Sequence, residues 1–568
     1  MDKRTTLALL LMAALLMIYP AIFMRSEPEK KPDQKTEAPV SPSPKGQDAA
    51  PTTTTGAALA APVPPKDAPS VLDRTATIEA PLYRAEVSSL GGQVRSWELH
   101  YRGAKPMVAP GFLASRGLSV TRVGQPSRLV GFVLSAEKLT LGPSTPTGDL
   151  VLTGEDGFGL RVTETLRFHA ESYLVDHQIK VENRQAVAQS AEIVLGWMSP
   201  VEPPKDTPER FQGQHPIRVV RWADGSVHRE VFAKGADFSG PGQWIGLESE
   251  WYLTAIIPRS PGMLLSETKI SEARADAPKP VELSQIGLRI PLSSLKPGQI
   301  WEGQAQSYIG PKEYDRLKAV GVRLEKSIYF GGFPAPQNYG GLPMEWLAVP
   351  ILWLMHRFYE FTHNYGVAII LLTVITKVLF FPLTIKSMTS MKAMQTLQPQ
   401  INALRSKYKS DPQRLQRETM ELYRTHKVNP LGGCLPMVVQ IPIFYALYVA
   451  LSVSVDIQNA PFICFGRLFG VDLWICDLAA HDPTYVLPIL MGISMFIQQK
   501  MTPVMGDPRQ AKMMLFMPVV FTFMFLNLPA GLVLYWTLSN VLQIAQQKYM
   551  ERIGKKPEKL PARAPKKA

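Results

Sequence analysis

Apolar and polar positions alternate with a period of two over much of residues 71–330. This period is typical of strands with one buried face, and turn residues such as Gly91-Gly92 and Asp224-Gly225 separate the runs. Many short strands without helical periodicity between them predict a β-sandwich, and residues 311–326 at its end are expected to be helical. The clearest alternating runs are Leu82–Val87, Val94–Leu99, Leu160–Phe168, Tyr173–Val181 and Glu192–Trp197.

The pattern changes after residue 340, where long apolar runs predict a helical membrane domain. Residues 340–363 are apolar and aromatic but include charges and Pro350, which favours an amphipathic helix on the membrane surface. A spanning helix is the alternative for this segment. Residues 364–550 then hold apolar runs near the ~20 residues that a crossing needs, except for one short run. The five predicted spans are 366–385, 434–455, 485–502, 513–527 and 530–547.

The charges of the connecting loops orient these spans. The loop 386–432 holds nine Lys and Arg against three acidic residues, whereas 456–484 holds one Arg against four Asp. Basic loops face the cytoplasm, and the basic tail 551–568 agrees with this alternation. Residues 1–25 have a basic start and an apolar run that predicts an N-terminal transmembrane anchor; a cleaved signal peptide is the alternative. The fold class is therefore a periplasmic β-sandwich plus a helical transmembrane bundle with six spans, N-in and C-in.

Two further segments are expected to have distinct roles. Residues 26–70 contain ten prolines and no aromatic residue, so they cannot build a core and predict a flexible periplasmic linker. The loop 386–432 predicts a cytoplasmic helical hairpin, because Asp411 and Pro412 can start its second helix and Gly432-Gly433 can end it.

Composition excludes several classes of function. The net charge of +13 could suit nucleic acid, but the basic residues lie beside apolar spans and specific nucleic-acid motifs are absent, which favours membrane lipids. The three cysteines show no zinc spacing, and no catalytic or nucleotide-binding signature is present. We therefore expect no enzyme activity, no metal and no cofactor.

Lys377 is the most unusual residue of the predicted spans. It lies eleven residues after Gly366, about 16 Å along a helix and thus near mid-membrane. A cation there is costly, and the five predicted spans contain no Asp or Glu. A water-filled cavity open to the cytoplasm would resolve this, and snorkelling to the inner interface is the alternative. The polar residues expected to line such a cavity are Thr373, Thr376, Gln440, Gln498, Ser539, Asn540 and Gln543.

Methionines form a second pattern just inside the membrane. Met388, Met391 and Met394 follow one another at a spacing of three residues in the basic hairpin. Flexible, polarisable side chains suit a surface that binds varied apolar segments, so we expect the hairpin to recruit substrates. Packing between two helices is the alternative.

Several motifs of the C-terminal region resemble the YidC/Oxa/Alb insertase core. They are Asn429-Pro-Leu-Gly-Gly-Cys-Leu-Pro436, Gln440-Ile-Pro-Ile-Phe-Tyr-Ala-Leu-Tyr448, Leu487-Pro-Ile-Leu-Met491, Phe516-Met-Pro518 and Pro529-Ala-Gly-Leu-Val-Leu-Tyr-Trp536. The large exported domain, ending in Gln306-Ser-Tyr-Ile-Gly-Pro-Lys312, is similar to the Gram-negative branch of this family. The match covers about residues 1–550.

This resemblance implies a membrane insertase and chaperone of the bacterial inner membrane. It implies a hydrophilic groove, open to cytoplasm and lipid, that receives nascent membrane proteins alone or with the Sec translocon. The ribosome would meet the basic cytoplasmic loops and tail. Thr373, Tyr535 and Trp536 match groove positions of the family, and Lys377 stands where arginine is usual.

Two other classes of function remain open from the residues alone. A secondary transporter with its site at Lys377 is disfavoured because neither an internal repeat nor acidic ion-coupling residues are present. A sensor whose sandwich binds an external ligand is the third class. Separately, Cys464 and Cys476 fall in an outward loop that is longer than usual for the family, so we predict that they can form a disulfide; two free thiols are the rival interpretation.

Overall fold

The computed structural model describes residues 73–553 with internal gaps. The predicted anchor 1–25, the linker 26–70, Gly432-Gly433, and most of the tail 551–568 lie outside the described residues. The gaps are 101–106, 109–114, 123–124, 126, 201–217, 232–236, 250, 273–280, 334–340, 410, 427, 429–434, 469–470 and 502–514.

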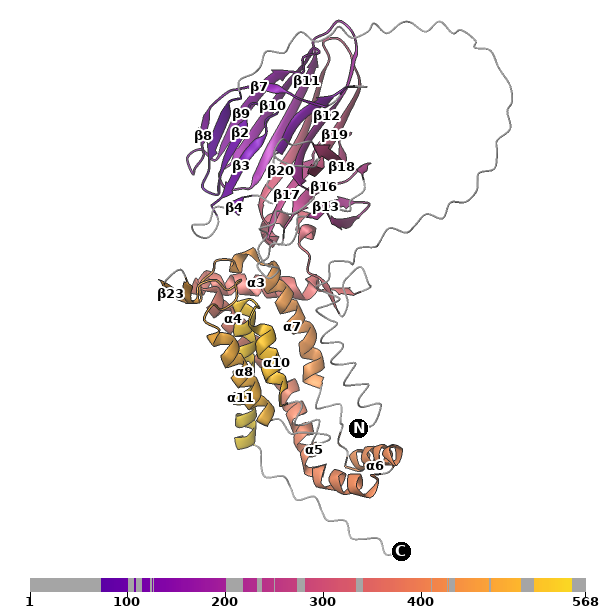
Figure 1. Ribbon diagram of the computed structural model, residues 1–568, viewed down its shortest axis with the longest axis vertical. Helices are drawn as coiled ribbons and strands as arrows, with labels where there is room; N and C mark the ends of the chain where they lie inside the picture. Colours follow the sequence, from indigo (N-terminus) through magenta and orange to yellow (C-terminus); the bar gives the residue numbers. More distant parts are fainter. Residues whose placement is uncertain are drawn as a thin grey trace, which may run out of the picture. The chain divides into compact units, whose positions relative to one another are not determined.

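Residues 75–311 form a domain rich in β-sheet (Figure 1). The largest sheet has the strand order β14-β13-β16-β17-β20-β11-β10-β9-β7, and two further sheets have the orders β15-β18-β19-β12-β5-β6 and β4-β3-β2-β1-β8. The strands are β1 (Thr75–Glu79), β2 (Tyr83–Ser88), β3 (Val94–Leu99), β4 (Met107–Val108), β5 (Ser115–Thr121), β6 (Arg128–Leu129), β7 (Gly131–Leu134), β8 (Lys138–Thr140), β9 (Thr147–Glu155), β10 (Leu160–His169), β11 (Leu174–Asn183), β12 (Gln189–Pro200), β13 (Arg218–Ala223), β14 (Ser226–Val231), β15 (Phe238–Gly240), β16 (Trp244–Glu248), β17 (Tyr252–Pro258), β18 (Leu264–Glu272), β19 (Val281–Leu295) and β20 (Ile300–Pro311).

The alternation seen in the sequence is the alternation of buried and outward side chains. In β10, Leu160, Val162, Glu164 and Leu166 are buried, while Arg161, Thr163 and Thr165 between them are partly exposed. Strand β11 repeats the pattern beside it in antiparallel register. The strand predictions in this region are therefore confirmed. Residues 311–326 are only partly helical, because Gly321 at φ +83° separates α2 (Tyr314–Ala319) from a 3₁₀ turn.

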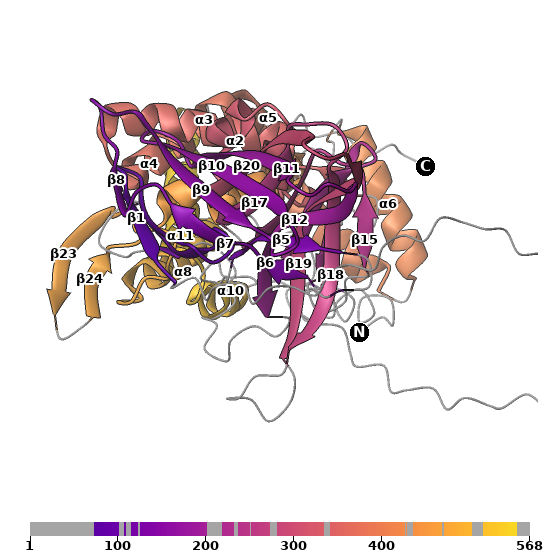
Figure 2. The same cartoon turned by 90° about the horizontal axis from the view of Figure 1, so that it is seen from above.

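The remaining described residues are mostly helical (Figures 1 and 2). The helix predicted over residues 340–363 is observed as α3, and its place on the membrane surface stays a prediction. Asp411 accepts a hydrogen bond from the Arg414 amide at the start of α6, as predicted. The elements are η2 (Leu324–Ser327), β21 (Gly332–Phe333), β22 (Leu342–Pro343), α3 (Glu345–Thr362), α4 (Tyr365–Leu379), α5 (Phe381–Lys407), α6 (Pro412–Thr425), α7 (Leu435–Val453), η5 (Val455–Ile457), β23 (Ile463–Leu468), β24 (Val471–Ile475), α8 (Val486–Met501), α10 (Met517–Phe525) and α11 (Ala530–Ile553).

The predicted span 366–385 is not one straight helix, and whether it crosses the membrane stays a prediction. Helix α4 ends at Leu379, and α5 begins at Phe381 after a bend of 59°. The reason is Pro382, which has no N–H to donate and restricts the residue before it. Within the described residues, no single helix has the length and apolar composition of a membrane crossing, whereas α4 and α5 taken as a bent pair do.

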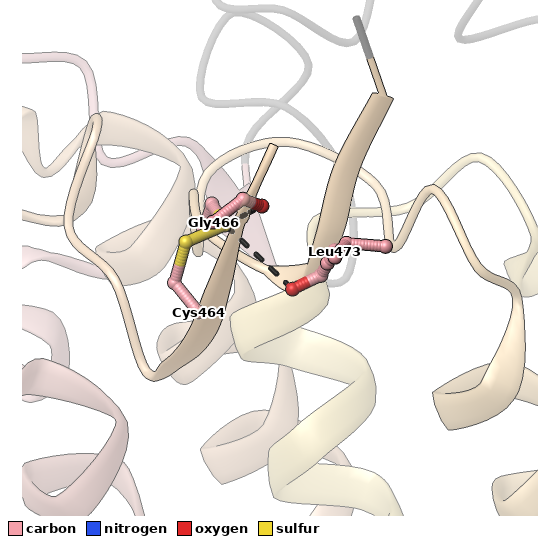
Figure 3. The surroundings of a disulfide bond; sticks show 4 residues. Cys464, Gly466 and Leu473 are labelled. Atoms are coloured by element: carbon pink, nitrogen blue, oxygen red, sulfur yellow. Dashed lines mark hydrogen bonds between the residues drawn. A yellow bond between two sulfur atoms is a disulfide. The ribbon is translucent and has the colours of Figure 1, made fainter. Parts of the chain in front are cut away.

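A small β-hairpin, β23 and β24, lies between α7 and α8. The structure joins Cys464 and Cys476 by a disulfide bond, with Cα atoms 4.6 Å apart (Figure 3). Asn364, which caps the first turn of α4, donates a hydrogen bond of 2.9 Å to the carbonyl oxygen of Phe462. The base of the hairpin is thereby fixed to the start of α4.

Candidate functional site

The helices enclose a cavity of about 510 Å³ between α4, α5, α7, α8 and α11, here called the bundle cavity. Its lining mixes amide, hydroxyl and methionine side chains with aromatic rings. The lining residues are Lys377, Thr384, Ser387, Met388, Met391, Lys392, Gln395, Gln440, Ile441, Phe444, Met495, Gln498, Met501, Tyr535, Trp536, Ser539, Asn540, Gln543, Gln547 and Met550.

Lys377 is half-buried at the wall of the bundle cavity. Its Nζ atom donates a hydrogen bond of 3.1 Å to Oε1 of Gln543 on α11. Both charged residues in the lining, Lys377 and Lys392, are cations, and no carboxylate lines the described cavity wall. A hydrated cavity with uncompensated positive charge can attract an anionic group without binding it tightly.

The bend between α4 and α5 places two of the predicted methionines in this cavity. Met388 and Met391 line it, whereas Met394 is 1% exposed and is absent from the lining. Two threonines that were expected to line the bundle cavity, Thr373 and Thr376, are not part of its lining. Thr373 is buried and donates its hydroxyl to the Ile369 carbonyl, while Thr376 lines a small adjoining cavity of about 20 Å³ together with Lys377 and Tyr535.

An aromatic cluster lies beside the polar side chains. Trp536 meets Phe444 edge-to-face at a ring distance of 4.4 Å and Phe525 at 5.0 Å. Tyr535 is buried and interacts with Gln440 and Thr376. The cavity thus offers polar groups to a hydrated segment and apolar rings to an uncharged one.

Hydrogen bonds from α11 fix the other walls. Asn540 donates to Ser494 of α8 at 3.1 Å, and Gln547 donates to the Met501 carbonyl at 2.6 Å. Lys392 of α5 donates to the Met550 carbonyl at 3.2 Å. These contacts make α11 the common wall that the other helices share.

Sequence reasoning missed several lining residues. Thr384 fell in the predicted span 366–385 but was not expected in the lining, and Ser387, Lys392 and Gln395 were assigned to the cytoplasmic loop 386–432, which was expected to begin outside the cavity. Their spacing of three to five residues, in step with Met388 and Met391, was the available signal.

A second polar group, in the β-rich domain, has the order of a hydrolase triad. His177 is hydrogen-bonded at 2.8 Å to Glu164 through Nδ1 and at 2.8 Å to Ser307 through Nε2. Ser307 is 2% exposed, and the adjoining cavity holds about 20 Å³. Such a volume admits roughly one water molecule, so Glu164, His177 and Ser307 cannot receive a substrate. Their hydrogen bonds instead satisfy buried polar groups inside the domain.

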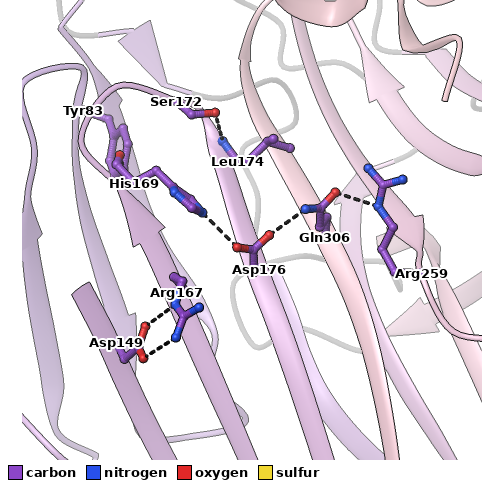
Figure 4. Close-up of polar contacts among 9 residues, drawn as sticks. All are labelled: Tyr83, Asp149, Arg167, His169, Ser172, Leu174, Asp176, Arg259 and Gln306. Carbon is purple, nitrogen blue, oxygen red and sulfur yellow. Dashed lines mark hydrogen bonds and ion pairs between the residues drawn. The ribbon is translucent and has the colours of Figure 1, made fainter. Parts of the chain in front are cut away.

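The outward face of the same sheet carries a row of polar pairs (Figure 4). Arg167 binds Asp149 through two hydrogen bonds of 2.8 and 2.9 Å. Asp176 accepts from His169 at 2.9 Å and from Gln306 at 2.6 Å. These groups satisfy one another across neighbouring strands, and the bundle cavity remains the candidate site.

Comparison with known proteins covers both parts of the chain. Residues 75–354 match the model described as the YidC periplasmic domain, and residues 357–558 match the 60Kd inner membrane protein model. The membrane protein insertase YidC of Syntrophus aciditrophicus is 37% identical over 97% of this chain and 100% of that protein. The one of Geobacter metallireducens is 36% identical over 97% and 98%. A crystal structure of an active YidC insertase is 17% identical with a TM-score of 0.35, covering 84% of this chain and 95% of that one.

Proposed function

Because the chain belongs to the YidC family of membrane protein insertases, we propose that the bundle cavity is the groove that receives segments of nascent membrane proteins. The protein is a multi-pass protein of the bacterial inner membrane with a periplasmic domain, and its relatives are insertases, not enzymes. The observation behind this proposal is the lining of the bundle cavity, which among the described residues holds two cations, several amides and hydroxyls, and no carboxylate.

The charge of the bundle cavity suits exported segments that contain Asp or Glu. Such segments meet a large desolvation cost in lipid. Lys377 offsets part of that cost while the segment is in transit, and the hydration of the cavity keeps the attraction weak enough for release.

The methionines suit the apolar part of the same substrates. Met388, Met391, Met495 and Met501 line the bundle cavity from α5 and α8. Unbranched thioether side chains adapt to ligands of different shape. The cavity can therefore accept apolar segments without a fixed sequence.

The finer arrangement belongs to this proposal as well. The topology has six spans with both termini in the cytoplasm, the groove is open to cytoplasm and lipid, and the protein acts alone or with the Sec translocon. The ribosome is recruited by the basic hairpin 386–432 and the tail. Complementation of a depleted strain separates these roles: deletion of 386–432 should abolish growth, whereas shortening of 26–70 should be tolerated.

Crosslinking of stalled ribosome–nascent-chain complexes tests the proposed groove directly. A photoreactive residue at Gln440 or Gln498, both in the cavity lining, should capture the nascent membrane segment. The matched control sites are Val519 and Phe523 on α10, which are 51% and 71% exposed on the outside of the helices. Equal capture at cavity and control sites would contradict the proposal.

A further inference from the structure

The hairpin β23–β24 is built more firmly than a connecting loop requires. The disulfide closes it across two antiparallel strands. The ring of Phe462 lies over Gly366 in the first turn of α4, where any Cβ would overlap it. After the hairpin, the carbonyls of Leu478 and Ala480 accept the amides of Gly531 and Ala530 at 2.9 and 2.7 Å, at the start of α11. The hairpin is thus anchored to the beginnings of two helices that form the bundle cavity.

These anchors place the hairpin at the periplasmic side. The periplasmic domain extends to residue 354, and α4 begins at Tyr365 shortly after it. The start of α4 therefore lies at the periplasmic end of that helix, and the Asn364–Phe462 hydrogen bond fixes the hairpin there. This is also the compartment in which a disulfide persists.

The hairpin carries an aromatic pair in which Phe465 is exposed and Trp474 is partly buried. Phe465 is 71% exposed, and its ring lies parallel to that of Trp474 at a centroid distance of 6.2 Å and an angle of 4°. Trp474 has φ +70°, in the left-handed region that bulky residues avoid. Strained backbone at a bulky residue persists only where its surroundings hold it, and Cys476, two residues further along, is held by the disulfide.

The charge of the hairpin argues against an electrostatic partner. Its two charged residues, Arg467 and Asp472, stand opposite each other in the strand register, so they cancel. An uncharged surface with an exposed Phe and a Trp matches the headgroup boundary of a bilayer, where aromatic rings concentrate. Helix α3 exposes Trp346, Trp353 and Phe361. In Figure 1, α3 and β23 lie at the same end of the helices, and Figure 2, seen from above, shows them apart from each other.

We propose that the disulfide-closed pair of strands β23 and β24 is a lipid anchor that seats the exposed Phe465, with Trp474 stacked behind it, in the outer-leaflet interface. Together with α3 it supports the periplasmic end of the helices from two sides. Because Phe462 just before the hairpin and Leu478 and Ala480 just after it are hydrogen-bonded to the starts of α4 and α11, this anchor sets the depth of the two helices that carry Lys377 and Gln543. The proposal does not depend on which substrate the bundle cavity receives.

Lipid photocrosslinking of the full chain tests this anchor. Benzoylphenylalanine replaces Phe465, and the protein is reconstituted in vesicles of phosphatidylethanolamine and phosphatidylglycerol. Phe523, with the same 71% exposure on α10, is the lipid-facing reference, and Val133, 70% exposed on β7 of the periplasmic domain, is the solvent-facing reference. Mass spectrometry should find at least fivefold more lipid adduct at position 465 than at 133, approaching the yield at 523.

Other outcomes overturn the proposal. Lipid adducts at position 465 no more frequent than at 133 would exclude bilayer contact. Adducts to protein, whether a second copy or a partner, would make the hairpin a protein-binding surface instead. The double variant C464S/C476S should lower the lipid yield at 465 at least threefold with the yield at 523 unchanged, and an unchanged yield at 465 would remove the disulfide from the mechanism.

Discussion

The Nζ atom of Lys377 on α4 donates a hydrogen bond of 3.1 Å to Oε1 of Gln543 on α11, 166 residues later in the chain. The partner is a neutral amide, so the contact orients the ammonium group without neutralising it. An ammonium has three donors, and two of them remain for water or for a passing carboxylate. The pair therefore keeps a positive charge available inside the bundle cavity.

Substitution of Lys377 should separate substrates by the charge of their exported tails. Lys377→Arg keeps the charge and should be tolerated. Lys377→Ala should slow insertion of acidic tails roughly three- to tenfold, the effect of about 0.7–1.4 kcal/mol, and spare uncharged tails; Lys377→Glu should be worse. Protease protection of matched substrates in vesicles measures this. Equal insertion of acidic tails by the parent, Ala and Glu forms would refute the electrostatic role.

Gln543 offers a second test that leaves Lys377 in place. Gln543→Glu puts a carboxylate beside the ammonium group, and the resulting ion pair should remove most of the attraction for acidic tails. The expected insertion defect resembles that of Lys377→Ala. Gln543→Met, which is of similar size and uncharged, is the control. It should insert substrates with acidic tails as well as the parent protein does. If Gln543→Glu and Gln543→Met insert substrates with acidic tails equally well, the charge of Lys377 does not attract those tails.

The cysteines predict a specific redox pattern. In oxidised membranes, non-reduced peptide mapping should find Cys464 linked to Cys476 and Cys434 alkylated. Closure of a loop of this length stabilises a protein by about 3 kcal/mol on the chain-entropy model, so reduction should lower the apparent melting temperature of the purified protein. Recovery of both cysteines as free, alkylated thiols would contradict the bond.

Glu248 predicts how the periplasmic domain responds to acid. This buried carboxylate binds Lys312 Nζ at 2.8 Å and faces Arg229 and Arg218. Burial raises its pKa, but the three cations lower the pKa more, so the net value lies below the ordinary 4.5. The ionised Glu248 carboxylate contributes its full stabilisation at pH values above its pKa in the unfolded chain. This stabilisation is lost as the pH falls through the lower pKa that Glu248 has in the folded domain.

Melting curves of the full chain against pH measure this contribution. The contribution of Glu248 to the free energy of unfolding should not change with pH above about pH 5 and should decrease below pH 4.5. Glu248→Gln should destabilise the domain by about 3–5 kcal/mol at neutral pH, because it leaves buried cations without their anion. It should also flatten the acid limb of the curve. An unchanged acid limb in the variant would show that other carboxylates control it.

The proposed topology can be tested by cysteine accessibility. Single cysteines at Met420, Gly470 and Leu560 probe the basic hairpin, the outward loop and the tail in a background without native cysteines. The residue at 470 should react in intact cells, and the other two only after permeabilisation. Any reversal would overturn the six-span arrangement.

Local patterns predicted most elements but few of their contacts. The alternation in Leu160–His169 and Leu174–Asn183 is a property of each strand, so it could be read without knowing the partner strand. The Lys377–Gln543 bond joins distant segments, and no local period encodes it. Because the sequence does not show which residue Lys377 contacts, Lys377 alone predicted only that a polar cavity was needed.

The boundary between α4 and α5 shows why the site was only partly predicted. An apolar run to residue 385 suggested one straight span, whereas Pro382 imposes a bend of 59°. That bend brings Ser387 and Met391 into the cavity lining. The hydrophobic pattern does not predict such a change of direction, because it indicates which residues are buried and not how the helix axis is oriented.

The role of α11 as common wall has a consequence for biosynthesis. This helix is translated after α4, α5, α7 and α8, yet it supplies Gln543 to Lys377, Asn540 to Ser494 and Gln547 to Met501. While α11 is still inside the exit tunnel, the earlier helices stand in the membrane with polar faces that nothing covers. The polar faces of the earlier helices therefore receive these partners only when synthesis of the chain is nearly complete.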